Sequence, residues 1–231
     1  MRKIVALLFG ISTLLLNAQQ KVNESLKKEL DAIMKTDQGY RKLFHTGITP
    51  EKKEQLLKDL NIDQEEFKKK DWLLVAEQDS LNMQKIENII AQYGYPGKTL
   101  VGEPTNKAAW FVIQHSTKIG KYLPLIKEAG KNKEIPFTLV AMMEDRSLMD
   151  EDKEQIYGTQ GKGEMTKDKD GKQVFISFVW PVKDLENVNK RRKEAGFDST
   201  IEENAKRMFG QDFKYEPYTL KQVLELRNKN K

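Results

Sequence analysis

Three apolar stretches of this chain each contain polar residues that could do chemistry. They span residues 110–116 (WFVIQHS), 139–146 (LVAMMEDR) and 157–160 (YGTQ). Burying His, Asp, Arg or Gln without a hydrogen-bond partner is costly, so such residues indicate either a polar site or a structural network. The sequence locates these groups, but it does not by itself select a reaction or a ligand.

His115 is the first candidate for a catalytic residue. Placed on a helix, it shares a face with Ala108, Phe111 and Val112, so we expect its side chain to point inward. There it could act as a general base, with the Asp145 carboxylate orienting or activating it. Two structural alternatives stay open: a neutral core histidine bonded to a backbone carbonyl, and a carboxylate in a salt-bridged helix tail.

A second group of candidates could hold an anionic part of a ligand. Arg146 and the Arg191-Arg192 pair would supply the positive charge, and Gln160 would supply hydrogen bonds. Tyr157 opens the same YGTQ segment and adds a hydroxyl group. The alternative interpretation of Arg191-Arg192 is a solvent-facing charged pair on a helix.

Common catalytic and metal-binding patterns are absent from the sequence. The segment from Gly158 to Gly163 lacks the spacing of a phosphate-binding loop, and there is no G-x-S-x-G or H-E-x-x-H. With no cysteine, and only His45 and His115, a zinc site would need several carboxylates. We therefore expect no metal and no cofactor. Paired-carboxylate glycoside chemistry stays open, because no spacing selects or excludes it.

The elements that must position these residues are mostly helices. Asp170-Gly171, just before the β-branched and aromatic run 173–180, predicts a hairpin whose first strand lies around 157–167. We therefore predict a mainly α fold, a single multi-helix domain with a small antiparallel β-hairpin near 157–181. Capping residues and apolar periodicity predict helices over 23–35, 49–60, 63–93, 104–116, 120–129, 136–148, 184–195, 199–208 and 219–227.

The first residues are typical of a secretory signal peptide. Two basic residues precede an apolar run over 4–16, and Ala18 offers a small residue for cleavage. We expect residues 1–18 to be removed and residues 19–231 to form the single mature domain, periplasmic or secreted. The alternative is an uncleaved membrane anchor, although the apolar run is short for a membrane span.

Charge and composition narrow the classes of partner. Without the two basic residues of the leader, 38 Lys and Arg face 35 Asp and Glu. The two signs alternate along most segments, as on solvated helix faces, and only residues 221–231 form a basic segment. We therefore expect no nucleic-acid partner and no stable membrane span after signal cleavage. Without cysteine the fold has no disulfides, so its stability must come from an apolar core.

Short motifs follow one another in a fixed order along most of the chain. They are Asp37-Gln38-x-x-Arg41, Asn82-x-x-x-Ile86, Gly94-x-Pro96, Trp110-x-x-x-Gln114-His115, Asp145-Arg146, Tyr157-Gly-Thr-Gln160 and Arg191-Arg192-x-x-x-Gly196. This order resembles a bacterial family of uncharacterised proteins catalogued as domain of unknown function 6624, over about residues 25–197. One departure is that Ser116 and Thr117 follow His115 where many members have Ala-Asp, which weakens any role for an acid beside the histidine.

The resemblance implies one shared polar site but brings no known activity. The residues it gathers are Asp37, Arg41, Asp79, Asn82, His115, Asp145, Arg146, Tyr157, Gln160, Arg191 and Arg192. Together they predict an exported protein with a polar pocket between helices that binds or processes a small, anionic ligand. Three classes stay open: a hydrolase or lyase, a small-molecule or cell-envelope binding protein, and an interaction or structural module of the envelope without catalytic activity.

Overall fold

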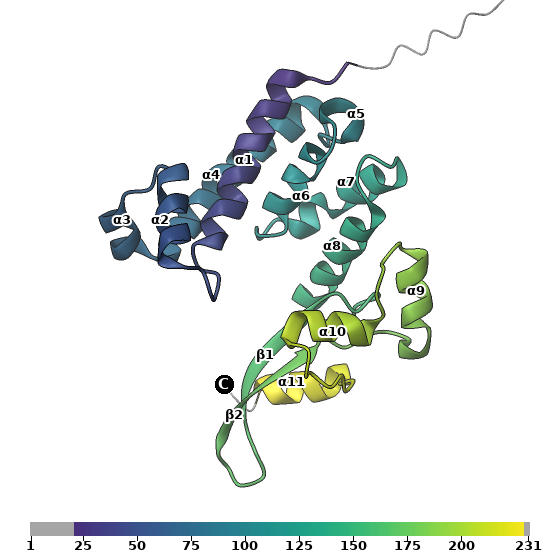
Figure 1. Ribbon diagram of the computed structural model, residues 1–231. Helices are drawn as coiled ribbons and strands as arrows, with labels where there is room; N and C mark the ends of the chain where they lie inside the picture. The colour runs from purple at the N-terminus through teal and green to yellow at the C-terminus, as the bar shows by residue number, and fades with distance from the viewer. Residues whose placement is uncertain (1–20, 229–231) are drawn as a thin grey trace, which may run out of the picture.

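The computed structural model describes residues 21–228, which form a mainly helical fold with one antiparallel hairpin (Figure 1). The predicted leader, residues 1–18, lies outside the described residues. The helices of the described chain are α1 (Glu24–Lys42), α2 (Pro50–Asp59), α3 (Gln64–Lys70), α4 (Trp72–Tyr93), α5 (Lys98–Val101), α6 (Ala108–Ile113), α7 (Ile119–Lys131), α8 (Phe137–Asp150), α9 (Val188–Glu194), α10 (Ile201–Phe209) and α11 (Leu220–Asn228). Two short 3-10 turns are η1 (Thr105–Lys107) and η2 (Leu185–Asn187). The predicted fold class is confirmed.

Helix α1 begins where its cap predicts but ends about two turns later than expected. The side chain of Asn23 accepts a hydrogen bond from the N–H of Leu26, 3.1 Å away, which satisfies a free N–H group of the first turn. The sequence predicts an end near Lys35, but the helix continues to Lys42. Asp37 and Arg41 lie one turn apart there and pair with each other, so a helical conformation brings the two charges together.

The predicted helix over 63–93 is divided into α3 and α4 at Asp71. This residue has a positive φ of 47°, and its N–H still donates to the carbonyl of Phe67. The bend lets Phe67 on α3 and Leu74 on α4 enter one apolar cluster with Leu43 and Leu57. Burial of apolar surface on both sides of the break therefore overrides the helical pattern of the sequence.

The helix predicted over 104–116 is also shorter than expected. It consists of η1 followed by the two turns of α6, which end at Ile113. Each of the five residues of α6 other than Phe111 is fully buried, so the helix is enclosed by its neighbours. His115 consequently lies in the turn between α6 and α7, outside any helix.

The hairpin is formed by β1 (Gly161–Lys167) and β2 (Gln173–Val179), paired from Gly161 opposite Val179 to Lys167 opposite Gln173. Gly171 has a φ of 79° in the connecting turn, as the Asp-Gly signal predicts. The YGTQ segment immediately precedes β1 instead of forming its first residues. Helices α9, α10 and α11 surround the base of the hairpin, and α8 lies between this part and the N-terminal helices (Figure 1).

The buried apolar residues form four clusters among the described residues. The largest joins α1, α4, α6, α7 and α8, and another joins the end of α1 with α2, α3 and the start of α4. The other two lie around the hairpin and the last three helices. The division at residues 18/19 and the single mature domain stay predictions. None of the described helices is both long enough and apolar enough to cross a bilayer.

Candidate functional site

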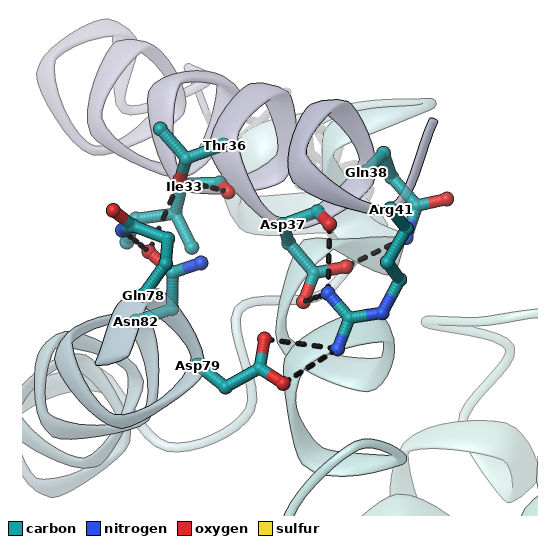
Figure 2. A network of polar contacts seen from close by, with 8 residues as sticks. All are labelled: Ile33, Thr36, Asp37, Gln38, Arg41, Gln78, Asp79 and Asn82. Carbon is teal, nitrogen blue, oxygen red and sulfur yellow. Dashed lines mark hydrogen bonds and ion pairs between the residues drawn. The ribbon is translucent and has the colours of Figure 1, made fainter. Parts of the chain in front are cut away.

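Arg41 lies between two carboxylates where the C-terminal turns of α1 pass α4 (Figure 2). Its Nη2 donates to both oxygens of Asp79, at 2.9 and 2.7 Å, and its Nη1 donates to Asp37 Oδ1 at 3.2 Å. The second Asp37 oxygen accepts a hydrogen bond from the side-chain amide of Gln38, 2.6 Å away. The structure thus brings together three of the predicted site residues.

Asp37 is fully buried in this network, which changes its protonation behaviour. Burial raises the pKa of its carboxyl group to about 6, although the Arg41 charge and the Gln38 hydrogen bond act in the opposite direction. Asp79 adds a smaller upward contribution, because it is a second negative charge near the first. Asp37 therefore titrates close to neutral pH and leaves Asp79 as the main counter-charge of Arg41.

Asn82 belongs to the same contact between α1 and α4 and is also fully buried. Its Oδ1 accepts hydrogen bonds from Thr36 Oγ1 at 3.1 Å and from Gln78 Nε2 at 2.8 Å. Its Nδ2 is buried without a hydrogen-bond partner within the described chain (Figure 2). Asn82 fixes the packing of α4 on α1, and it retains an unused donor beside the Arg41 network.

His115 is exposed in the turn after α6, so the prediction that it points inward from a helix is wrong. Desolvation, followed by the positive charges of Arg41 and Arg146, lowers the pKa of His115 to about 4. Solvent at the exposed face of the residue weakens the desolvation, but both guanidinium groups act in the same direction. The imidazole is therefore neutral at pH 7, and it lies within the electrostatic range of Arg41 on α1 and Arg146 on α8.

Arg146 is the group in this region whose charge is least compensated. It is half-buried on α8, and within residues 21–228 it makes no hydrogen bond and no ion pair within 4 Å. Burial lowers its pKa, while the more distant Asp150, one turn along α8, acts in the opposite direction. Arg146 does not pair with its sequence neighbour Asp145, whose carboxylate accepts from the segment after α8.

A groove of about 280 Å³ adjoins the Arg41 network and the His115 turn. One wall is α4, which contributes Asp79, and the other is the segment directly after His115. Hydroxyl and amide groups from both walls make its lining suited to a small polar molecule. Its lining residues are Asp79, Ser80, Met83, Gln84, Ser116, Thr117 and Lys118.

Asp145, the predicted orienter of His115, instead holds the backbone of the YGTQ segment. Its fully buried carboxylate accepts the N–H groups of Ile156, Tyr157 and Thr159, at 2.7 to 3.2 Å, and the Thr159 hydroxyl at 2.9 Å. Burial raises its pKa, and these donors oppose the shift. A buried carboxylate needs a cation or several donors, and here four donors are present. The expected hydrogen bond to His115 is not formed.

Arg191 and Arg192 hold the same segment from the other side, so their predicted role as the anion-binding pair does not fit their contacts. Arg192 is almost completely buried, and it donates to the carbonyl of Tyr157 at 2.8 Å and to Ser199. Arg191 donates to the carbonyl of Ile156 and pairs with Asp184. Their N–H groups are used by the protein itself, which leaves few for a ligand.

Tyr157 and Gln160 contact other parts of the protein. The N–H of Tyr157 donates to the carboxylate of Asp145, and its carbonyl accepts from Arg192. Gln160 Nε2 reaches the Met142 carbonyl at 3.3 Å and the hydroxyl of its neighbour. Among the described residues no hydrogen bond joins either of them to His115 or to the Arg41 network, so the predicted site residues fall into two separate groups of contacts.

The two groups differ in what their polar atoms do. The group formed by Asp37, Arg41, Asp79, Asn82, His115 and Arg146 is called the junction cluster below. It retains unused donors and borders a groove. The group around Tyr157 to Gln160 satisfies its own backbone and serves the fold. Within the described residues, no three His, Cys, Asp or Glu side chains are grouped as metal ligands would be.

Sequence reasoning missed two residues that hold the YGTQ segment. Gln155 is fully buried; its amide nitrogen donates to the carbonyls of Gln160 and Trp180, and its oxygen accepts the N–H of Gln160. Asn204 on α10 donates to the carbonyl of Gly158 at 3.0 Å. No local pattern marks either residue. Gln155 gains its role because the chain turns back on it at Gln160, and Asn204 gains its role because α10 packs against Gly158.

The protein is mainly helical, and α8 lies between the N-terminal helices, which carry the Arg41 network, and the hairpin with its YGTQ segment (Figure 1). The chain belongs to a family of unknown function, DUF6624, whose sequence profile matches residues 25–214. This confirms the resemblance inferred from the order of the motifs. No curated protein and no solved structure matches the chain significantly.

Proposed function

We propose that this protein binds a small anionic molecule at the junction cluster. The observation that carries the proposal is Arg146, a half-buried guanidinium without a hydrogen-bond or ion-pair partner among the described residues. A partly desolvated cation loses part of its hydration, and for Arg146 the distant Asp150 offsets only part of that loss. An anion bound there would supply the missing charge and hydrogen bonds.

The surroundings of Arg146 support an anion more than a cation or an apolar ligand. Arg41 and Arg146 both act on His115 and favour its neutral form. A neutral imidazole can donate one hydrogen bond and accept another, so it adds directionality without adding charge. The groove beside Asp79 and Ser116 adds a hollow with a polar lining next to the turn that carries His115.

We also propose that the protein is exported. The charged and apolar order of residues 1–18 supports secretion, with a mature chain that begins at Gln19. Mass spectrometry of protein recovered outside the cytoplasm is expected to give an N-terminus at Gln19. Recovery of the full-length chain from the cytoplasm alone would overturn this part of the proposal.

A thermal-shift experiment on the mature chain tests the binding site. Phosphate, sulfate, acetate and citrate are added at constant ionic strength to the unmodified protein, to Arg146→Gln and to Arg207→Gln. Arg207 is the matched control, because it is an exposed arginine on α10 that pairs with Asp198 at the protein surface. An anion at about 100 times its dissociation constant adds about 2.7 kcal/mol to stability.

We expect at least one anion to raise the melting temperature of the unmodified protein and of the control, but not of Arg146→Gln. If none of the four anions does so, or if Arg146→Gln responds like the control, the proposed function is wrong. Isothermal titration of the anion with the largest shift gives the dissociation constants for the three proteins.

A further inference from the structure

The positive charges of the junction cluster are compensated unequally, and this limits the charge of a ligand. Arg41 contacts two carboxylates directly, Asp79 at 2.7 Å and Asp37 at 3.2 Å. Among the described residues, the carboxylate that acts on Arg146 is the more distant Asp150, beyond ion-pair distance. The cluster therefore has one positive charge available, and a second negative charge on a ligand would meet the carboxylates around it.

The groove provides no second cation to change this balance. The one lysine among its lining residues is Lys118, whose ammonium group lies 2.7 Å from Glu87. That glutamate also binds Lys121 and the hydroxyl of Tyr122, so it is firmly held where it is. His115 adds no charge at pH 7, since desolvation and then the charges of Arg41 and Arg146 lower its pKa to about 4.

The charge of the available group favours a monoanion. A guanidinium presents parallel N–H groups in a fixed fork, which can bind the two oxygens of a carboxylate or of a phosphate. Within residues 21–228 the fork of Arg146 is unused, whereas in Arg41 both terminal nitrogens are occupied by Asp37 and Asp79. A phosphate dianion would bring a second negative charge that Arg146 alone does not balance, whereas a carboxylate brings one.

From this we infer that the ligand is a monocarboxylate, whose carboxylate is held by the unpaired guanidinium of Arg146. This inference rests on the proposed function and specifies its ligand class. Arg146 then acts as the specificity-determining residue. The Arg41–Asp79 ion pair stays intact and forms the adjoining wall.

Binding of acetate and propionate, compared with inorganic phosphate, tests the inference on the mature protein. Titrations at pH 7.5 and constant ionic strength use the unmodified chain and the variants Arg146→Lys, Arg146→Gln and Arg207→Lys. Lysine at position 146 keeps the charge but removes the fork, so it separates charge from shape. Arg207→Lys makes the same exchange at an exposed site outside the cluster.

We expect the carboxylates to bind at least tenfold more tightly than phosphate, and Arg146→Lys to lose at least tenfold of that affinity. Phosphate binding that is tighter than carboxylate binding and depends on Arg146 would overturn the ligand class but leave the anion site standing. Carboxylate binding that is unchanged in Arg146→Lys would overturn the role of the fork. Binding of neither anion would overturn the proposed function as well.

Discussion

Asp145 and Thr159 are joined twice, because one carboxylate oxygen accepts both the N–H of Thr159 at 3.0 Å and its hydroxyl at 2.9 Å. This double contact ties α8 to the loop that enters the hairpin. It also explains why a carboxylate can be buried here with no cation in contact. A residue that the sequence marks as a catalytic candidate is thus an anchor of the backbone.

Asp145→Asn is expected to lower the free energy of unfolding by about 2–4 kcal/mol, because the amide cannot accept from all four donors and leaves buried N–H groups unpaired. Urea denaturation followed by circular dichroism measures the change. Glu154→Gln is the control, since Glu154 is an exposed carboxylate in the segment that follows α8. Equal stabilities of the two variants would contradict the anchoring role.

Arg192→Met is expected to cost about 2–4 kcal/mol of stability, because it removes buried hydrogen bonds to Tyr157 and Ser199 and leaves those acceptors unpaired. The exposed counterpart is Arg207→Met on α10, for which we expect a loss of about 1 kcal/mol or less. Thermal and urea unfolding compare the two. A smaller loss in Arg192→Met than in Arg207→Met would show that the guanidinium does not support the loop.

Gly158→Ala and Gly171→Ala separate backbone strain from steric overlap. Both glycines have positive φ, 68° and 79°, so each substitution incurs about 1–2 kcal/mol of strain. A Cβ at Gly158 would also overlap the side chain of Ile201, whereas at Gly171 it meets no atom within 4 Å. We expect Gly158→Ala to be the more destabilised by at least about 1 kcal/mol in urea unfolding. Equal losses would mean that α10 moves aside.

The pKa of His115 is expected to rise above its value of about 4 in Arg146→Gln, because one of the two charges that oppose its protonation is removed. NMR titration of the imidazole carbon-bound protons measures this, with His45→Asn used to assign the signals. Arg207→Gln should leave the titration of His115 unchanged. A titration that is the same in all three proteins would place Arg146 out of range of His115.

The pH dependence of stability reports on Asp37. Its folded-state pKa of about 6 lies above the ordinary value of 3.8, so the native state takes up the proton first. This group therefore contributes stability below pH 4 that is lost as pH rises through 6. We expect the unmodified protein to gain stability relative to Asp37→Asn as pH falls from 7 to 5. The opposite trend, measured by urea unfolding, would mean that Arg41 dominates over burial.

Much of the secondary structure was predictable because its causes are local. Asn23 and Thr49 cap helices where the sequence indicates, and Gly171 closes the hairpin turn. The break at Asp71 was not predictable from spacing, since it depends on Phe67 and Leu74 reaching the same apolar cluster. The same limit applies to His115, whose helix ends early where the surrounding helices enclose α6.

The sequence by itself determined the mainly helical class, the family, and the polar residues that matter, because propensity, caps and the order of motifs are properties of the chain. Only the tertiary structure decided how those residues are divided. Asp145 and Arg192 acquire donors and acceptors from a loop and so become structural, while Arg146 receives no hydrogen-bond or ion-pair partner from residues 21–228. Adjacent positions on one helix point to different neighbours, and a linear motif cannot specify which of them meets a protein atom and which is left for a ligand.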